Sequence, residues 1–349
     1  MKILVVGSFP PPFGGTSVTL GYLVDALSQK KGVDIKVVDT NGIRNKGVLG
    51  VVLFVKAMLK TLLYSFSVDV ISIHIASSAL PIWGLWMLFC SRVTVRPLVV
   101  RKFAGFNYWK LGAMKGRLAH YVVCHSALYL AETKELVKYA IERDKMNHCK
   151  WFPTARPLPE RPVDAPVFYG KCNRYVFISH VRAYKGVREL TDATKMCDKD
   201  ITVDVYGPWF DDLPRNLFDD CSRIRYHGVL DPKDVVKTLL QYDALVLPTK
   251  AASEGYPGIV LEAYSAGLPI ITTTCGAIPE IVTDKTGILV PPGDVDSLYL
   301  AMMRLAKDAK LFNELKTGVR EQAAQFASDV WADRFVDYCR EIAGKNAGS

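Results

Sequence analysis

The sequence predicts an α/β protein with two doubly wound domains, each a parallel sheet with helices on both faces. The chain has 349 residues, which is more than one hydrophobic core usually holds. Short apolar runs alternate with helical patterns along its whole length, as in βαβ units. A stretch with five prolines, residues 150–168, interrupts this alternation and has the composition of an interdomain linker.

The first half opens on a buried strand, KILVVG at 2–7, and a Pro/Gly-rich loop at 8–17. A helix is expected at 18–29. Short apolar runs rich in β-branched residues predict four further strands, at 34–40, 68–75, 96–105 and 120–126. Each is expected to join one parallel sheet, because helical segments separate the strands.

The second half repeats this pattern. The predicted strands are 174–179, 201–207, 224–228, 244–249, 269–273 and 287–290, and the chain is helical from about 294. The expected domains are 1–160 and 161–328, with a helix over 329–349 that packs back on the first domain. Two such domains would enclose a cleft, with ligands bound outside the carboxyl ends of the strands.

Charge is distributed unevenly between the halves. Residues 1–160 carry 21 Lys and Arg against 9 Asp and Glu, whereas residues 161–349 carry 23 against 26. The first half therefore suits an anionic partner. Nucleic acid is disfavoured because no recognised binding motif accompanies the charge. An anionic membrane surface remains as a partner.

Two apolar stretches in the basic half bear on that interpretation. Residues 47–66 contain Lys56 and Lys60, and residues 79–90 contain two tryptophans. We count neither as reaching the ~20 apolar residues that span a bilayer. Both suit helices lying in a membrane interface, and both equally suit buried helices of an α/β domain. The sequence leaves these alternatives open.

The chain shows no metal or redox signature. Its eight cysteines form no CxxC pair. Asp211-Asp212 and Asp219-Asp220 fall in polar loops and are expected to be solvated. No secretory signal precedes the first strand, so we expect a cytoplasmic location, no tightly bound metal and no cofactor.

The segment SEGYPGIVLE, residues 253–262, carries the clearest chemical signal. Pro257-Gly258 should start a helix, which places Glu254 in the loop before it and Glu262 about one turn inside. A helix N-terminus suits a phosphate, and carboxylates accept hydrogen bonds from paired hydroxyls. The segment therefore fits a sugar–diphosphate–ribose ligand. Two glutamates at this spacing are also common on solvated surfaces.

Its surroundings resemble the retaining glycosyltransferases of family 4, which have the GT-B fold. Residues 242–294 contain a proline after a strand, the E-x7-E pair, AGLP, a GxxPE segment, GILV and PGD. These are Pro248, Glu254 and Glu262, 266–269, 276–280, 287–290 and 292–294. Looser matches at 10–15, 179–190 and 205–209 extend the resemblance over most of the chain.

The resemblance implies a role for each matched residue. Glu254 would lie near the transferred sugar, and Glu262 would contact the ribose hydroxyls. Lys185 and an arginine would neutralise the diphosphate, as phosphate chemistry requires. His180 stands at the arginine position of the family, so Arg182 is the expected substitute. The residues expected to contact the donor are Gly14, Gly15, Gly207, Gly255, Tyr256, Pro257, Gly258, Ile259, Val260 and Glu262.

One family feature is missing. Relatives carry a histidine-glycine pair after a strand of the first domain, and the corresponding residues here are Ala104-Gly105. His74 and Lys102 are the candidate polar groups for the acceptor side. His74 is equally expected as a satisfied structural histidine.

The resemblance implies a retaining transferase that moves a sugar from a nucleotide-diphosphate sugar, with UDP preferred, to a saccharide or lipid-linked saccharide. Such chemistry builds polysaccharide, lipopolysaccharide or capsule, here at the inner face of the cytoplasmic membrane. A GT-B nucleotide-sugar epimerase and a non-catalytic membrane adaptor are the alternatives. The epimerase lacks evident catalytic carboxylates, and retention of Glu254, Lys185 and Glu262 disfavours the adaptor.

Overall fold

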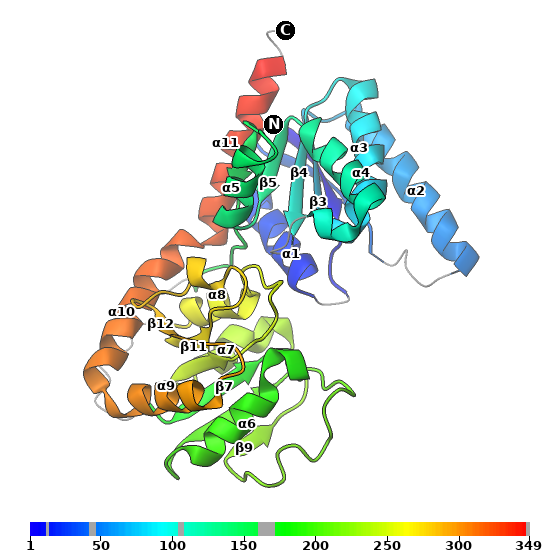
Figure 1. Ribbon diagram of the computed structural model, residues 1–349. Helices are drawn as coiled ribbons and strands as arrows, with labels where there is room; N and C mark the ends of the chain where they lie inside the picture. Colours follow the sequence, from blue (N-terminus) through cyan, green and yellow to red (C-terminus); the bar gives the residue numbers. More distant parts are fainter. Residues whose placement is uncertain (12–13, 42–46, 104–107, 160–171, 347–349) are drawn as a thin grey trace. The chain divides into compact units, whose positions relative to one another are not determined.

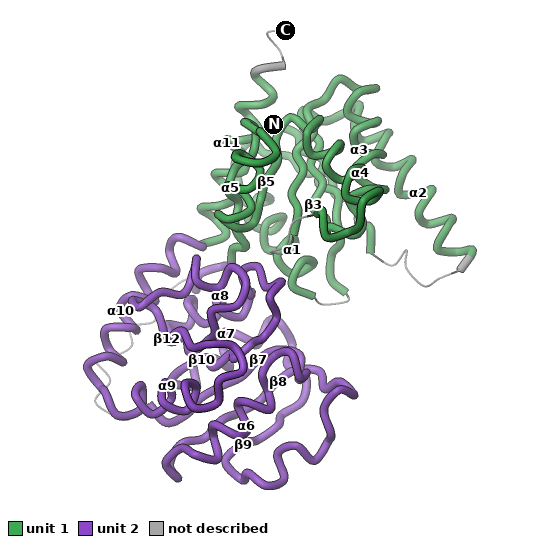
Figure 2. The backbone as a smooth tube through the Cα atoms, viewed as in Figure 1, with its two compact units in different colours: residues 1–155, 327–349 green, residues 156–326 purple. Residues whose placement is uncertain are grey.

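The computed structural model describes residues 1–11, 14–41, 47–103, 108–159 and 172–346 (Figure 1). The chain forms two compact units, which Figure 2 shows in green and purple. Unit 1 comprises residues 1–155 and 327–349, and unit 2 comprises residues 156–326. These boundaries lie within a few residues of those expected from the sequence, at 160 and 328.

Unit 1 contains a six-stranded sheet in the order β2-β1-β3-β4-β5-β6, with every pair parallel. The strands are β1 (Lys2–Gly7), β2 (Asp34–Asp39), β3 (Val70–Ala76), β4 (Leu98–Phe103), β5 (Leu128–Ala131) and β6 (Cys149–Trp151). Alternate residues of β1 enter different cores. Leu4 and Val6 lie in one apolar cluster, and Ile3 and Val5 lie in the other, because successive side chains of a strand point to opposite faces.

Helices cover both faces of this sheet. The helices of unit 1 are α1 (Gly15–Ser28), α2 (Gly47–Ser65), α3 (Leu80–Thr94), α4 (Ala113–Cys124), α5 (Lys134–Glu142) and α11 (Ser328–Asn346), with short 3-10 turns η1 (Ser77–Ala79) and η2 (Tyr108–Leu111). Side chains of α2, α3, α4 and α5 share one core, and those of α1 and α11 share the other. The helix expected near the end of the sequence is α11, and it belongs to unit 1 (Figure 2).

Two predictions in unit 1 were wrong. Residues 120–126 form the end of α4 and the turn after it, and the strand is β5, which starts at Leu128. The run looked like a buried strand, but Ala119, Val122 and Val123 are buried at the three-to-four spacing of a helix face. Residues 150 and 151, the first two of the predicted linker, belong with Cys149 to the edge strand β6, which pairs with β5.

Unit 2 repeats the architecture with another strand order, β12-β11-β10-β7-β8-β9, again all parallel. The strands are β7 (Arg174–Ile178), β8 (Thr202–Tyr206), β9 (Ile224–Tyr226), β10 (Ala244–Leu247), β11 (Ile270–Thr273) and β12 (Gly287–Val290). All six lie where the sequence predicted strands. The order reverses between β7 and β10, so the topological switch point of the sheet lies at their carboxyl ends.

The helices of unit 2 are α6 (Val187–Met196), α7 (Val235–Leu239), α8 (Gly258–Ser265), α9 (Val295–Lys307) and α10 (Ala309–Gln325), with 3-10 turns η3 (Ala183–Lys185), η4 (Pro232–Asp234) and η5 (Ile278–Glu280). The prediction that a helix starts at Gly258 is confirmed: Pro257 is its N-cap. Gly267 follows its C-cap with a φ of +72°, which ends the helix as expected.

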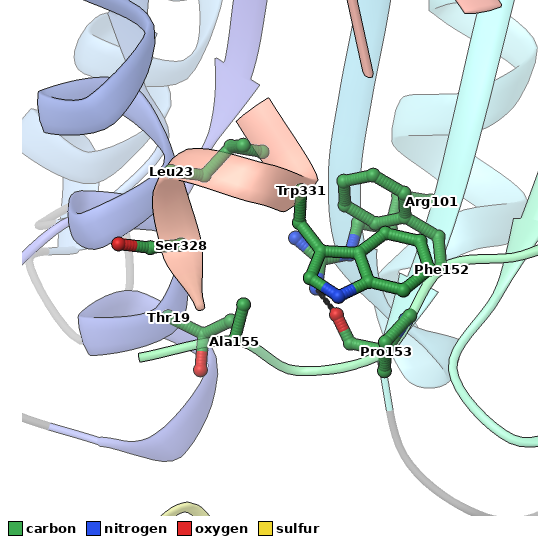
Figure 3. Close-up of a pocket in the computed structure, with 8 residues that line it drawn as sticks. All are labelled: Thr19, Leu23, Arg101, Phe152, Pro153, Ala155, Ser328 and Trp331. Carbon is green, nitrogen blue, oxygen red and sulfur yellow. Dashed lines mark hydrogen bonds between the residues drawn. The ribbon is translucent and has the colours of Figure 1, made fainter. Parts of the chain in front are cut away.

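Phe152 and Pro153, which follow β6 near the end of the first segment of unit 1, are tightly packed (Figure 3). The Arg101 guanidinium lies 4.6 Å from the Phe103 ring centroid and 4.5 Å from that of Phe152, and it donates to the Pro153 carbonyl at 3.0 Å. Trp331 of α11 meets Phe152 edge to face, with ring centroids 5.3 Å apart. The cavity beside them holds only ≈ 10 Å³, room for about one water molecule. This region is therefore core and offers no ligand pocket.

Candidate active site

Two loops of unit 2 meet at the switch point of its sheet. One follows β7 and carries His180, Arg182 and Lys185. The other follows β10, carries Glu254 and runs into α8. Ligands of doubly wound sheets bind at this position. The topology thus brings together residues about 70 positions apart in the sequence, as the Lys185–Glu254 separation of 69 illustrates.

Lys185 and Glu254 form a short ion pair across these loops. Both side chains are largely buried, with 14% exposed. Thr249 donates a further hydrogen bond to the same carboxylate oxygen at 3.2 Å. Gly186 explains how the loops come so close: its φ is +76°, and a Cβ there would lie 1.9 Å from the Pro248 carbonyl oxygen. Glycine is therefore required at position 186 for the two loops to come close enough to form the ion pair.

The GxxPE segment supports the Glu254 loop from the other side. The Ala277 amide donates to the Glu254 carbonyl at 3.0 Å. A Cβ on Gly276 would lie 2.3 Å from that carbonyl oxygen, so only glycine allows this approach. Glu280 accepts a hydrogen bond of 2.6 Å from the Tyr256 hydroxyl. The segment therefore fixes the backbone on which Glu254 stands.

Glu262 pairs with an arginine that our sequence analysis missed. Arg156 Nε donates to Glu262 Oε1 at 2.7 Å, and the arginine side chain is only 4% exposed. The guanidinium also reaches the first residue of α8, because a Cβ on Gly258 would lie 1.9 Å from Arg156 Nη2. Glu262 is thus not a solvated surface acid. Arg156 lies in the proline-rich stretch taken as a linker, and nothing local marks it as a partner of Glu262.

Arg182 is arranged differently from Lys185. Its Nε lies 3.4 Å from Asp212 Oδ2, its guanidinium lies 4.5 Å from the Phe210 ring centroid, and about a third of the side chain is exposed. Asp212 also accepts from the Ala183 amide at 3.1 Å. Asp212 is exposed, as expected, and it has these two partners as well. It anchors the loop that carries Arg182.

His180 lies near the positive charges of Lys185 and Arg182. Its ring is 5.1 Å from that of Phe210, measured between centroids. Partial burial, followed by the positive charges of Lys185 and Arg182, lowers the pKa of His180 below its ordinary value. The neutral form of His180 is therefore favoured. At the arginine position that the resemblance implies, this chain has no permanently charged side chain.

The remaining donor-contact candidates of unit 2 fall into two groups. Gly255, Pro257, Gly258 and Ile259 are partly exposed around the start of α8, where free backbone N–H groups lie. Tyr256 and Val260 are buried, and Gly207 has a φ of +131° with Ser179 packed against it. The first group is accessible to a ligand. In the second group, burial or backbone conformation accounts for the residue type without a ligand.

The acceptor-side candidates lie in unit 1 and are buried. His74 Nε2 lies 2.8 Å from Ser72 Oγ, and burial holds the pKa of His74 well below its usual range. Lys102 Nζ lies 3.4 Å from Ser77 Oγ, and burial lowers the pKa of Lys102 to about 8. Their role toward an acceptor stays a prediction. The Ala104-Gly105 pair lies outside the described residues.

Gly14 and Gly15 stand at the start of α1. Gly14 is the N-cap in an extended conformation with a φ of −158°, and Gly15 is the first helical residue rather than part of the loop. Among the described residues, a Cβ on Gly15 would meet nothing within 4 Å, and one on Gly14 would meet only Ser17 Oγ at 3.8 Å. The packing of the described residues therefore does not require glycine at these positions.

Among the described residues, no group of three or more His, Cys, Asp or Glu side chains could hold a metal ion. All eight cysteines are free thiols. The expectation that catalysis needs no metal stays a prediction.

A family model matches most of unit 2. Residues 172–308 match the family model described as "Glycosyl transferases group 1". This range contains Lys185, Glu254 and Glu262. It covers most of unit 2 and none of unit 1.

The curated relatives align over short stretches. A GDP-mannose-dependent monoacylated alpha-(1-6)-phosphatidylinositol monomannoside mannosyltransferase of Corynebacterium glutamicum is 32% identical over 107 residues, which is 29% of this chain and 28% of that protein. The sulfoquinovosyl transferase SQD2 of Arabidopsis thaliana is 29% identical over 124 residues, or 34% of this chain and 24% of that protein. The aligned part thus spans about a quarter of these relatives.

Solved structures match nearly the whole chain. HepE of Anabaena in complex with UDP superimposes with a TM-score of 0.76 at 16% identity, over 98% of this chain and 100% of that one. The lipopolysaccharide outer core galactosyltransferase WaaB in its apo form gives a TM-score of 0.68 at 15% identity, over 98% and 99%. At this identity the likeness shows the fold, which is GT-B.

Proposed function

We propose that this GT-B chain, whose residues 172–308 match group 1 glycosyltransferases, is a retaining glycosyltransferase of family 4 that uses a nucleotide-diphosphate sugar. The observation that carries the proposal is the buried Lys185–Glu254 pair at the switch point of the unit 2 sheet. A lysine positioned there by a carboxylate can stabilise the negative charge that develops on a departing diphosphate.

The donor would bind along α8. Its diphosphate would face the free N–H groups at Gly258, where the helix dipole and the Arg156 guanidinium add positive charge. Glu262 has one oxygen on Arg156, so its other oxygen would accept the ribose hydroxyls. Lys185 would exchange its contact with Glu254 for the diphosphate as the sugar arrives. Glu254 would then lie beside the sugar.

The reaction follows from this arrangement. The bond between the anomeric carbon and the diphosphate oxygen breaks, and its electron pair leaves with the diphosphate. Lys185, the α8 N-terminus and Arg182 stabilise that charge. The acceptor hydroxyl attacks the same face of the sugar, and its proton passes to a phosphate oxygen. Configuration is retained without a covalent enzyme intermediate.

We propose UDP as the nucleotide, supported by structural neighbours that were solved with UDP. The acceptor would be a saccharide or a lipid-linked saccharide in polysaccharide, lipopolysaccharide or capsule biosynthesis. Support comes from relatives whose names refer to phosphatidylinositol mannoside and to colanic acid. The reaction would take place in the cytoplasm, at the inner face of the membrane, with unit 1 on the acceptor side.

Donor hydrolysis tests the enzyme class. Wild type would be incubated with UDP-, GDP- and ADP-sugars without acceptor, beside Glu254→Ala and a control, Lys307→Met, at the exposed Lys307–Asp198 contact of unit 2. We expect one donor to release its nucleoside diphosphate slowly, with loss in Glu254→Ala only. Epimerisation of the donor sugar without release would favour the epimerase. No turnover and no thermal shift with any nucleotide would favour the adaptor.

A further inference from the structure

Helix α2 turns an apolar stripe toward solvent. Val48, Val52, Val55, Leu59 and Leu63 are spaced by four, three, four and four residues, which places them on one helical face. Their exposed fractions run from 48% to 83%. A helix on the surface of a water-soluble domain carries polar residues at the centre of this face. The centre of the outer face of α2 is aliphatic instead.

The opposite face of α2 fixes its orientation. Gly50, Ala57, Thr61 and Ser65 are buried and follow one stripe on the far side of the helix. Thr61 Oγ1 accepts a hydrogen bond of 2.8 Å from the indole nitrogen of Trp86 on α3. Phe54, Met58 and Leu62 also pack against the core of unit 1. This inner face already has apolar packing, so the stripe of Val48, Val52, Val55, Leu59 and Leu63 is a second apolar face that points outward.

The charges around this surface have one sign. Helices α2, α3 and α4 contain no acidic residue. Between residues 40 and 131, Asp69 is the only acid, against 11 Lys and Arg, of which Arg101 and Lys102 are buried. Lys56 and Lys60 flank the aliphatic stripe of α2, one helical turn apart, where long side chains can keep their charges in water. An apolar surface edged only by positive charge is complementary to an anionic bilayer.

A helix of this kind could either cross a membrane or lie in the membrane plane. By length and composition Val48–Ser65 is sufficient to cross a membrane, so our count from the sequence was too strict, and only 22% of that window is buried. However, α2 connects β2 to β3, and these strands both flank β1 in one sheet. A helix tied to the sheet at both ends and packed on α3 cannot be surrounded by lipid. It can lie in the membrane plane.

We propose that α2 inserts its outer stripe (Val48, Val52, Val55, Leu59 and Leu63) into the acyl region of an anionic membrane, with its axis parallel to the surface. Lys56 and Lys60 then lie at the headgroups. Hydrophobic insertion, rather than charge alone, holds the protein there. This inference deepens the membrane location suggested above, but it does not depend on the transferase chemistry of unit 2.

Vesicle flotation of the full-length protein tests the proposal. Vesicles of phosphatidylcholine with 30% phosphatidylglycerol would be compared with pure phosphatidylcholine, at about 0.1 M and 0.5 M salt. We expect wild type to float with anionic vesicles at both salt concentrations, because insertion is insensitive to screening. Leu59→Ser/Leu63→Ser should reduce the partition coefficient at least about tenfold. Lys56→Gln/Lys60→Gln should reduce it only at low salt.

The control is Leu300→Ser on α9 of unit 2, where Leu300 is 60% exposed, and it should float like wild type. Donor hydrolysis by each variant in detergent separates this proposal from the proposed function, since every variant should keep its activity. Wild type that stays with the solution at low salt would overturn insertion. Binding that disappears at 0.5 M salt and ignores Leu59 and Leu63 would also overturn it. A dimer that Leu59→Ser/Leu63→Ser dissociates, without flotation, would assign the stripe to a second copy of the chain.

Discussion

Two motif glycines of unit 2 and two of unit 1 differ in what their positions require. In unit 2, Gly186 and Gly276 have positive φ and would drive a Cβ into backbone atoms. In unit 1, Gly14 and Gly15 lack both features. The fold itself therefore demands the first pair, whereas an approaching ligand is our explanation for the second. A motif residue can thus serve the site by shaping it or by leaving it open.

The largest expected effect on kcat comes from removing the charge of Lys185 while Gly186, which shapes the loop, is kept. Lys185→Met keeps Gly186 and the loop geometry but removes the cation beside Glu254. We expect kcat to fall about 10²- to 10³-fold, as for loss of one group that stabilises a transition state. Thermal stability should also fall, because the largely buried Glu254 carboxylate loses its charged partner, so turnover is measured well below the Tm of the variant. Steady-state kinetics with the donor found by the hydrolysis scan measures the effect, and unchanged kcat would remove Lys185 from the mechanism.

The two kinds of glycine give the next prediction. Gly276→Ala should lower the free energy of unfolding of unit 2 by about 2–4 kcal/mol, because of its left-handed φ and its contact with the Glu254 carbonyl. Gly15→Ala lies in the first turn of α1 and should change stability by less than about 1 kcal/mol while lowering kcat/KM. Urea unfolding monitored by circular dichroism, together with donor turnover, measures both. Equal destabilisation by the two substitutions would remove the distinction.

Arg156 would influence ribose binding through Glu262, to which it donates a hydrogen bond. Arg156→Met should free Glu262 and weaken UDP binding about tenfold, the scale of one charged hydrogen bond. Binding of 2′,3′-dideoxy-UDP, which lacks the ribose hydroxyls, should weaken less, because only the positive charge near the diphosphate is lost. Calorimetric titration of wild type, Arg156→Met, Glu262→Gln and the double variant measures the coupling. An equal loss for both nucleotides would contradict a role of Arg156 in ribose binding through Glu262.

The smallest effect concerns the buried lysine of unit 1. The pKa of Lys102 is lowered to about 8 in the folded protein, against 10.5 for the ordinary side chain. The unfolded chain then binds more protons between these values, so stability rises with pH. The stability of wild type relative to Lys102→Met should increase by about 1 kcal/mol from pH 7 to pH 9. Urea unfolding at both pH values measures it, and a flat difference would contradict a lowered pKa.

Sequence patterns predicted the parts of the fold that local periodicity determines. Every strand of unit 2 and the start of α8 at Gly258 were placed correctly, because strand, turn and cap signals agree there. The strand at 120–126 failed because four apolar residues fit a helix face as well as a buried strand.

The candidate site was predictable only where neighbours in sequence are neighbours in space. Arg156 could not be found, since it meets Glu262 across 106 residues and lies among prolines. The orientation of α2 was equally inaccessible, because its composition fits both a core helix and an interfacial one. Only packing showed which side faces outward. Long-range contacts and exposure therefore supplied what periodicity could not.

The division of unit 1 into two segments has a consequence for biosynthesis. Its core includes Trp331, Phe335 and Cys339 of α11, which are made after all of unit 2. The Arg156 amide donates to the Phe326 carbonyl at 2.9 Å, so unit 2 begins and ends at one point. Unit 2 is thus complete on the ribosome while unit 1 still lacks a helix. The order in which the two units become complete is therefore the reverse of the order in which they begin: the first residues to emerge wait for the last helix.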